Sequence, residues 1–215
     1  MRARLRSLSG RDQAASAFGA ILLRLCDSVG APGAALVDPE GETVDYAGTI
    51  DPFDIRIAAA ELRLILKEVS AVSIWSDTDE IILRGSKKSF ALVAMEEGYA
   101  IVIQLLPHCF SVSYRAVSEA VREASSEAGL PLASRYVEGE HWTRVEVRPT
   151  PGDERRPHAI WYGGTWCVVE VLGRYHDADL DRGELGYRAR LANGAEVGLV
   201  REQLGRWYAE ELPQL

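Results

Sequence analysis

The chain has 215 residues, of which 47 % are hydrophobic and 26 % charged, an ordinary globular composition that excludes a disordered or fibrous protein. This length allows one or two domains. The formal net charge of −8 argues against a general nucleic-acid binder, because phosphate contacts need a basic surface. Three widely spaced cysteines without a CxxC pair predict a reducing compartment, no disulfide framework and no zinc site: Cys26, Cys109 and Cys167.

The N-terminus carries Arg2, Arg4 and Arg6, a basic start that can precede a signal peptide. The apolar stretch after it is interrupted by Arg24 and Asp27, so no signal peptide is predicted. No run reaches the roughly 18 apolar residues that a membrane-spanning helix needs. We therefore expect a cytoplasmic protein with no membrane span, whose residues 1–10 form a solvated tail.

Composition changes near residue 130. Four of the five tryptophans lie in residues 135–215, and all the lysines lie before them. The segment Gly129-Leu-Pro-Leu-Ala-Ser134 is typical of a helix stop followed by a connector. We predict a first domain at residues 11–130, a linker at 131–140 and a second domain at 141–215.

The first domain is predicted to begin with a helix over Asp12–Val29. Ser9 and Asp12 form a start signal, apolar residues follow at helical spacing, and Gly30 ends the pattern. Two short strands, residues 34–37 and 42–46, surround a turn that contains Pro and Gly and indicates a β-hairpin.

A second helix is predicted over Phe53–Val69, with Asp51 as its N-cap and Pro52 in its first position. Projected at about 100° per residue, it has two apolar faces. The wide face comprises Ile55, Ala58, Ala59, Leu62, Ile65, Leu66 and Val69. The narrow face comprises Phe53, Ile57, Ala60 and Leu64. An acidic stripe (Asp54, Glu61, Glu68) and a basic stripe (Arg56, Arg63, Lys67) separate the two faces.

Two surfaces can cover the narrow face. The first predicted helix can pack on it within the same chain, or a second copy or another protein can bind there. The sequence leaves both alternatives open. Under the second, the interface comprises Phe53, Ile57, Ala60, Leu64, Arg56 and Arg63.

Three further strands are predicted at residues 80–84, 89–95 and 99–106, the last with almost no polar alternation, as expected of a central strand. A helix over residues 112–128 follows, with an apolar face of Tyr114, Val117, Val121, Ala124 and Ala128. The order helix, two strands, helix, three strands, helix predicts an α+β domain, in which helices sandwich a five-stranded antiparallel sheet.

This order resembles the Roadblock/LC7 family over about residues 11–130, in the pieces A-A-L-V-D-P-E-G-E-T-V, the long helix, and D-E-I-I-L-R-G-S-K-K-S-F-A-L-V-A-M-E-E-G-Y-A-I-V-I-Q-L-L. The resemblance implies a homodimer whose sheets join edge to edge and whose central helices pack together. It also implies a partner, a small Ras-like GTPase, for which bacterial members act as activators or scaffolds in polarity, motility or signalling. Such members typically donate no arginine finger, so no catalytic residue is carried over. The chain departs from simple members in the 80 or so residues that follow.

The second domain contains several short alternating stretches. Hairpins are predicted at residues 158–171 around Gly163-Gly164 and at residues 186–199 around Asn193-Gly194, with strands at 142–147 and 206–208 and a polar loop at 149–157. Five or six strands in about 75 residues predict a small all-β barrel similar to SH3-like folds.

Four groups of residues are candidates for binding or chemistry. Asp177, Asp179 and Asp181 alternate as in calcium loops, but the spacing departs from the EF-hand pattern, and a solvated loop is favoured. Cys109 beside His108 is a weak candidate dyad, since neighbours on an extended chain point apart. Lys87 and Lys88 form a basic turn that can meet an acidic partner. Aromatic residues of the second domain fill its core or line a peptide groove: Trp161, Tyr162, Trp166, Tyr187, Trp207 and Tyr208.

No nucleotide-binding or catalytic motif is present, so no cofactor, metal or enzymatic activity is predicted. We expect a non-enzymatic, dimeric regulator or scaffold of a Ras-like GTPase. The alternative is a structural adaptor that dimerises through the first domain and binds a protein or peptide through the aromatic second domain. The possible partner surface then includes Lys87, Lys88, Trp161 and Tyr162.

Overall fold

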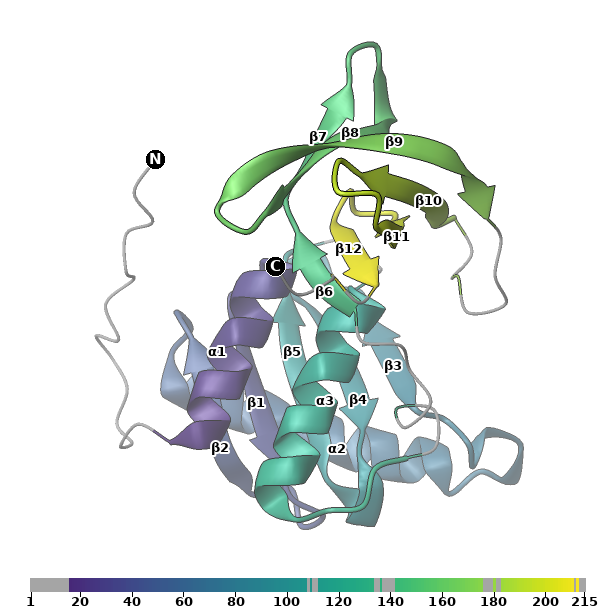
Figure 1. Cartoon of the computed structure of the whole chain (residues 1–215). Coiled ribbons are helices and arrows are strands. Elements are labelled where there is room, and N and C mark those ends of the chain that lie inside the picture. Colours follow the sequence, from purple (N-terminus) through teal and green to yellow (C-terminus); the bar gives the residue numbers. More distant parts are fainter. Residues whose placement is uncertain are drawn as a thin grey trace. The chain divides into compact units, whose positions relative to one another are not determined.

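The computed structural model describes residues 16–107, 109, 112–133, 136, 142–175, 180, 183–210 and 212. The chain divides into two compact units, Met1–Glu138 and Gly139–Leu215. Figure 1 shows helices and strands together in the first unit and strands alone in the described part of the second.

The first unit has the predicted order of elements. They are α1 (Ala17–Val29), β1 (Gly33–Val37), β2 (Thr43–Gly48), α2 (Pro52–Ser70), the short 3₁₀ helix η1 (Ser73–Trp75), β3 (Glu80–Leu83), β4 (Ser89–Ala94), the 3₁₀ turn η2 (Glu96–Gly98), β5 (Ala100–Leu105) and α3 (Tyr114–Ala128). The predicted αββαβββα arrangement is confirmed.

The five strands form one antiparallel sheet in the order β2-β1-β5-β4-β3. In the register of the three inner strands, Ala35 lies opposite Val102, and Val102 opposite Leu92. Every residue of β1 and β5 is buried, which explains why the last of the predicted strands shows no polar alternation. The edges of the sheet are β2 and β3.

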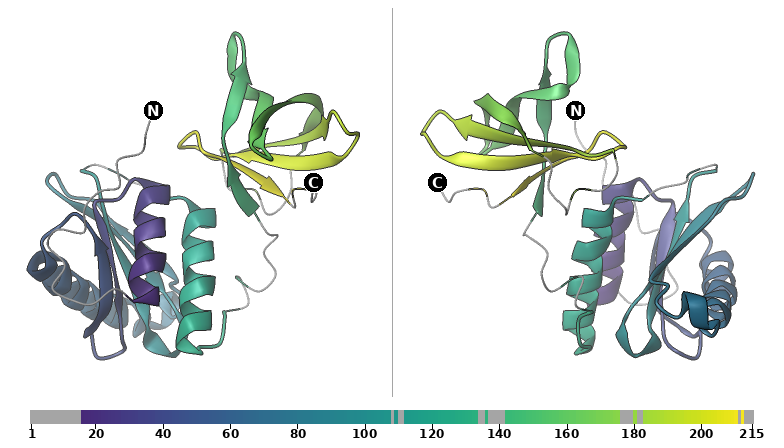
Figure 2. Two further views of the ribbon diagram at one scale, coloured as in Figure 1. Left: turned by 60° about the vertical axis from the view of Figure 1, so that its left-hand side comes forward. Right: turned by 90° about the vertical axis from the view of Figure 1, so that its right-hand side faces the viewer.

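Helices cover both faces of this sheet (Figure 2). On one face α1 and α3 pack over side chains such as Leu36, Ile101 and Ile103. On the other face α2 packs over Val37, Leu92 and others. Alternate residues of each strand therefore enter two separate cores, as the two-residue period of a strand requires.

Capping residues set the helix ends. Ser16 begins α1, its side chain accepting from the Gly19 backbone N–H at 3.0 Å, so this helix begins later than the predicted Asp12. The proposed start signal, Ser9 and Asp12, lies outside the described residues. Gly30 and Gly129 end α1 and α3 with φ of 69° and 68°, values that favour glycine.

The buried face of α3 differs from the prediction by about one position. Val117, Val121 and Ala124 are buried as expected, but Tyr114 and Ala128 are exposed. Small residues that the pattern did not emphasise, Ala116 and Ala120, are buried instead and let α3 approach the sheet closely.

Part of the predicted linker belongs to the first unit. Leu130, Leu132 and Ala133 pack against the core beneath α1 and α3. Tyr136 is buried in the same core, and its ring stacks on that of Tyr114 at a centroid distance of 6.4 Å. The helix-stop signal at Gly129 thus marks the end of α3 but not the end of the packed unit.

The second unit consists of seven antiparallel strands in the order β6-β12-β11-β10-β9-β8-β7. They are β6 (Trp142–Val145), β7 (Val147–Thr150), β8 (Asp153–Tyr162), β9 (Thr165–Tyr175), β10 (Leu185–Leu191), β11 (Glu196–Arg201) and β12 (Trp207–Glu210). The predicted hairpins around Gly163-Gly164 and Asn193-Gly194 are both present. The predicted polar loop at 149–157 is wrong, because this stretch forms the β7–β8 hairpin.

The seven-stranded sheet is curled (Figure 1). The two ends of the strand order, β6 and β7, are consecutive in the chain and are separated only by Glu146. β6 pairs with β12, whereas β7 pairs with β8, and the Trp161 N–H donates to the Glu146 carbonyl at 2.8 Å. The second unit is therefore a curled seven-stranded sheet, and the predicted SH3-like barrel is not confirmed.

Candidate protein-interaction surface

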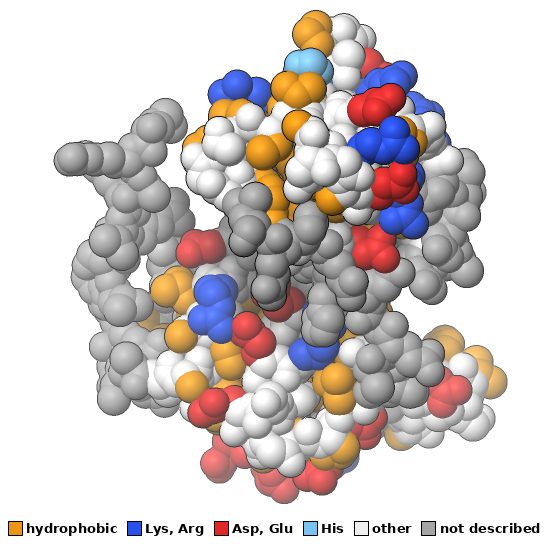
Figure 3. Space-filling view, in the orientation of Figure 1, with side chains coloured by type: hydrophobic (Ala, Val, Ile, Leu, Met, Phe, Trp, Pro, Cys, Tyr) orange, Lys and Arg blue, Asp and Glu red, His pale blue; other side chains and the backbone are white. Residues whose placement is uncertain are grey.

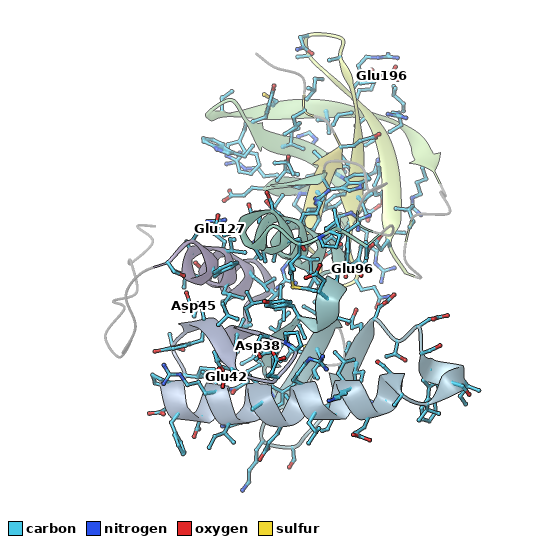
Figure 4. All side chains as sticks on the ribbon, turned by 90° about the horizontal axis from the view of Figure 1, so that it is seen from below. Asp38, Glu42, Asp45, Glu96, Glu127 and Glu196 are labelled. Atoms are coloured by element: carbon cyan, nitrogen blue, oxygen red, sulfur yellow. The ribbon has the colours of Figure 1, made fainter. Side chains whose placement is uncertain are left out.

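The most prominent exposed apolar surface of the first unit is the outer face of α2, defined as Phe53, Ile57, Ala60 and Leu64. The side chains of Phe53, Ile57 and Leu64 are 69 %, 42 % and 58 % exposed. Ala60 is exposed between them. Figure 4 shows side chains of α2 projecting away from the sheet. The structure therefore brings the predicted narrow face together as one surface.

Local chemistry fixes where this surface begins. Asp51 is the N-cap of α2, and its carboxylate accepts from the Phe53 backbone N–H at 2.9 Å. Pro52 occupies the first turn, where a missing N–H costs nothing. Phe53, the first exposed apolar side chain, thus lies immediately after the cap.

The opposite face of α2 is buried, although less broadly than predicted. Ile55, Ala59, Leu62 and Leu66 pack into the sheet core. Ile65, which the sequence placed on the buried face, is 41 % exposed. On the helical projection the acidic stripe lies between Ile65 and the outer face, so Ile65 is an exposed apolar side chain separate from that face.

The first helix does not cover this surface. α1 packs with α3 on the other face of the sheet, so the alternative in which α1 covers the narrow face is wrong. Within the part of the chain that the structure describes, the apolar outer face of α2 stays exposed.

The two charged stripes beside the outer face differ in their contacts. The Arg56 guanidinium lies 5.1 Å from the centroid of the Tyr46 ring, and Arg63 Nε donates to the Gly98 carbonyl at 2.8 Å. Both arginines are thereby held against their own sheet. In the acidic stripe, Asp54 pairs with Lys88 at 3.1 Å, whereas Glu61 and Glu68 are exposed.

A second exposed apolar group follows α2 and was not singled out by the sequence patterns. Val72, Ile74 and Trp75 are 41 %, 78 % and 53 % exposed, and η1 contains the last two. In the sequence this group is a short apolar run between a helix and a strand, too short to show helical or strand periodicity. It extends the apolar surface beyond the C-terminal end of α2.

A polar pocket of about 450 Å³ lies at this end of α2. Arg63 and Lys67 line it together with Asp79, Glu96 and Tyr99. Two cations and two carboxylates share the lining, so no single ligand charge is favoured there. Lys67 is itself exposed on the basic side of the helix.

The predicted basic turn is partly used within the chain. Lys88 contacts Asp54, as described above, and both side chains are about half exposed. Lys87 is exposed and makes no ion pair within the described residues. The structure therefore leaves Lys87 as the accessible cation of the turn.

In the second unit, the two neighbouring aromatics proposed as a partner surface point to opposite sides. Trp161 is 43 % exposed and meets Trp166 edge-on at a centroid distance of 5.5 Å. The Arg148 guanidinium lies 4.0 Å from the Trp166 ring centroid. Tyr162 instead packs against the core, where Tyr187 and Trp207 are buried. Exposed Val168 and Leu172 continue the outer apolar group along β9.

One side of this unit carries charged side chains. Figure 3 shows acidic and basic side chains alternating over one side of it. Arg190 lies 3.5 Å from Glu170 and 3.0 Å from Glu196, and Arg188 lies 3.7 Å from Glu210. Arg148, by contrast, has no acidic partner in the described part of the chain.

The cysteines are separate, and none forms a disulfide. Burial, with a smaller contribution from the Asp27 charge, raises the pKa of the Cys26 thiol to about 12. Cys109 and Cys167 are half-buried. His108, the proposed neighbour of Cys109, lies outside the described residues, as do Asp177, Asp179 and Asp181.

Within the described ranges, no three His, Cys, Asp or Glu side chains gather closely enough to hold a metal ion. None of the described helices is both long and apolar enough to cross a membrane.

The first unit has the order of helices and strands expected from the resemblance to the Roadblock/LC7 family, and its strands lie in the order β2-β1-β5-β4-β3. No protein-family model and no curated protein matches the chain. Among solved structures, it is similar to Myxococcus xanthus MglB at 15 % identity and a TM-score of 0.46, covering 54 % of this chain and 98 % of that one.

Two further solved structures show a similar likeness. The gliding protein MglB from Thermus thermophilus has 14 % identity and a TM-score of 0.43, covering 51 % of this chain and 90 % of its own. A Roadblock/LC7 domain from Streptomyces avermitilis has 15 % identity and a TM-score of 0.41, covering 52 % and 94 %. These likenesses concern the fold of about half of the chain.

Proposed function

We propose that this protein is a non-catalytic dimeric regulator or scaffold of a small Ras-like GTPase, acting in bacterial polarity, motility or signalling. The observation that carries the proposal is the exposed outer face of α2. A Roadblock-like fold accounts for the buried face of that helix but leaves Phe53, Ile57 and Leu64 in water. A second copy packing on this face gives them an apolar environment.

Burial of apolar surface between the two copies favours the dimer. Burying a large aliphatic or aromatic side chain contributes about 1.5–3 kcal/mol, and a two-fold interface doubles the number of such side chains. Ile65, across the acidic stripe, and Ile74, in η1, are further exposed apolar residues. Three large side chains from each copy supply a central apolar cluster of the kind that dominates binding energy in protein interfaces.

The GTPase part of the proposal is tested with the whole chain. The protein is immobilised and exposed to small Ras-like GTPases of its own organism, loaded with GDP or with a non-hydrolysable GTP analogue, and hydrolysis of GTP is measured in parallel. Nucleotide-dependent retention supports the proposal, and a faster hydrolysis rate distinguishes an activator from a scaffold. Absence of binding in both nucleotide states contradicts it.

A second candidate function is an adaptor that binds a protein or peptide through the second unit. The observation that favours it is the exposed Trp161 beside Trp166, with the Arg148 guanidinium stacked on Trp166. Aromatic and arginine side chains are enriched at protein interfaces. If this candidate is right, Trp161→Ala removes partner binding and leaves dimerisation unchanged. Leu64→Asp then removes dimerisation and leaves partner binding unchanged.

A further inference from the structure

Unpaired carboxylates lie beside the apolar side chains on the outer face of α2, whereas the arginines of the helix contact their own sheet. Glu61 and Glu68 are exposed and make no ion pair within the described part of the chain. On the other side, Arg56 is stacked on Tyr46 and Arg63 is bonded to Gly98. Lys67 lines the pocket at the end of the helix. A partner that packs on this face therefore meets apolar groups with two unpaired carboxylates on one side and the exposed Lys67 on the other.

The carboxylates follow the apolar residues closely. Glu61 lies one helical turn after Ile57, and Glu68 lies one turn after Leu64. Asp54, Glu61 and Glu68 repeat every seven residues, which places them on nearly one side of the helix at intervals of about 10 Å. Asp54 is neutralised by Lys88 from the β3–β4 turn, but the other two have no such counterion.

A symmetric pair of helices brings like sides together when the helices are antiparallel. A two-fold axis perpendicular to α2 relates residues on one side of the helix to the same side of the partner helix. Helix macrodipoles favour this antiparallel arrangement over a parallel one. Because the acidic residues repeat about every 10 Å, a two-fold axis near the middle of α2 places each glutamate within about 5 Å, along the helix axis, of an acidic position of the partner.

We propose that these facing carboxylates oppose self-association through α2, so that the dimer strengthens when salt screens them. The proposal rests on the dimer proposed above and adds its regulation. At about 0.1 M ionic strength the screening length is about 10 Å, which matches the spacing of the charges. Raising the salt concentration therefore removes most of the repulsion while leaving the apolar contact in place.

The test is the dimer dissociation constant of the full chain, measured by analytical ultracentrifugation at about 50 and about 500 mM NaCl. We expect the constant to fall by about threefold to tenfold at the higher salt concentration. The double variant Glu61→Gln/Glu68→Gln should dimerise more tightly than the wild type at low salt and lose this salt dependence. Its matched control, Glu119→Gln/Glu127→Gln, changes exposed glutamates on α3 and should behave as the wild type does.

A mixing experiment tests the geometry separately. Wild-type chains mixed with Glu61→Lys/Glu68→Lys chains should form the mixed dimer beyond the statistical half, because each glutamate then faces a lysine. A dimer that weakens with salt, or that is unaffected by the glutamine substitutions, overturns this proposal but leaves the dimer intact. Monomers at both salt concentrations, for the wild type and the glutamine variant alike, overturn the dimer and this proposal together.

Discussion

Lys88 Nζ lies 3.1 Å from Asp54 Oδ2 and connects the β3–β4 turn to the first turn of α2. The basic turn thus contributes to the first unit itself. Both side chains are about half exposed, so water and salt weaken the attraction. The contact pairs the first carboxylate of the acidic stripe and adds little to the stability of the fold.

This contact gives the first prediction. Lys88→Ala should lower the free energy of unfolding by at most about 0.5 kcal/mol, measured by urea denaturation at low salt, and the difference should shrink at high salt. Lys87→Ala, which removes a cation with no ion pair in the described part of the chain, is the control. A loss above about 2 kcal/mol for Lys88→Ala would contradict a solvent-exposed pair.

The N-cap of α2 gives the second prediction. Asp51→Ala removes the acceptor for the Phe53 N–H and should lower the free energy of unfolding by about 1 kcal/mol. Asp51→Asn keeps a capping oxygen and should unfold nearly as the wild type does. Equal losses for the two substitutions in the same urea titration would show that the cap is not the cause.

A buried hydroxyl in the second unit gives the third. Tyr187 is 1 % exposed, and its hydroxyl donates to the Arg155 carbonyl at 2.7 Å. Tyr187→Phe leaves that carbonyl without its partner and should cost about 1 kcal/mol of unfolding free energy. Tyr162→Phe is the control, because the Tyr162 hydroxyl has no hydrogen bond in the described part of the chain. A neutral result for Tyr187→Phe would refute the hydrogen bond.

The cysteines give the fourth. Burial holds the Cys26 thiol protonated with a pKa of about 12, so at pH 8 a thiol reagent should modify Cys109 and Cys167 well before Cys26. In denaturant all three should react. Equal rates for the three thiols in the folded protein would contradict the burial.

The same thiol affects stability at high pH. Above pH 9.0, the ordinary pKa of a cysteine thiol, Cys26 ionises in the unfolded protein but stays protonated in the folded protein, because its folded pKa is about 12. This part of the unfolding free energy is therefore complete below pH 9 and decreases as the pH rises from about 9 to about 12. Comparison of the wild type with Cys26→Ala isolates it, since the variant should lack this decrease.

Much of the first unit could be predicted from the sequence because its signals are local. Asp51 and Pro52 mark the start of α2, and the almost entirely apolar run of residues 100–105 marks a strand covered on both faces. The two-faced pattern of α2 also grouped together the side chains that form its outer face, although it left open what covers them. Helical period and capping chemistry each act within a few residues, so a single sequence records them.

The features that the sequence did not predict depend on contacts between residues that are distant in the sequence. The packing of Tyr136 on Tyr114 is one case, because no local pattern separates a connector from a segment that returns to the core. The β7–β8 hairpin is another, since Pro149 and Pro157 read as loop residues but lie opposite each other in bulged strands. The stacking of Arg148 on Trp166 follows from strand register, which periodicity does not reveal.

The central claim, that the outer face of α2 is the dimer interface, is tested most directly by the molar mass of the full chain in solution. Sedimentation equilibrium should give twice the chain mass for the wild type and the mass of one chain for Leu64→Asp, because a carboxylate at the centre of the apolar face cannot be buried unpaired. Leu204→Asp, at a similarly exposed leucine of the second unit, should remain dimeric. A dimeric Leu64→Asp, with a circular dichroism spectrum like that of the wild type, would contradict the assignment of this face.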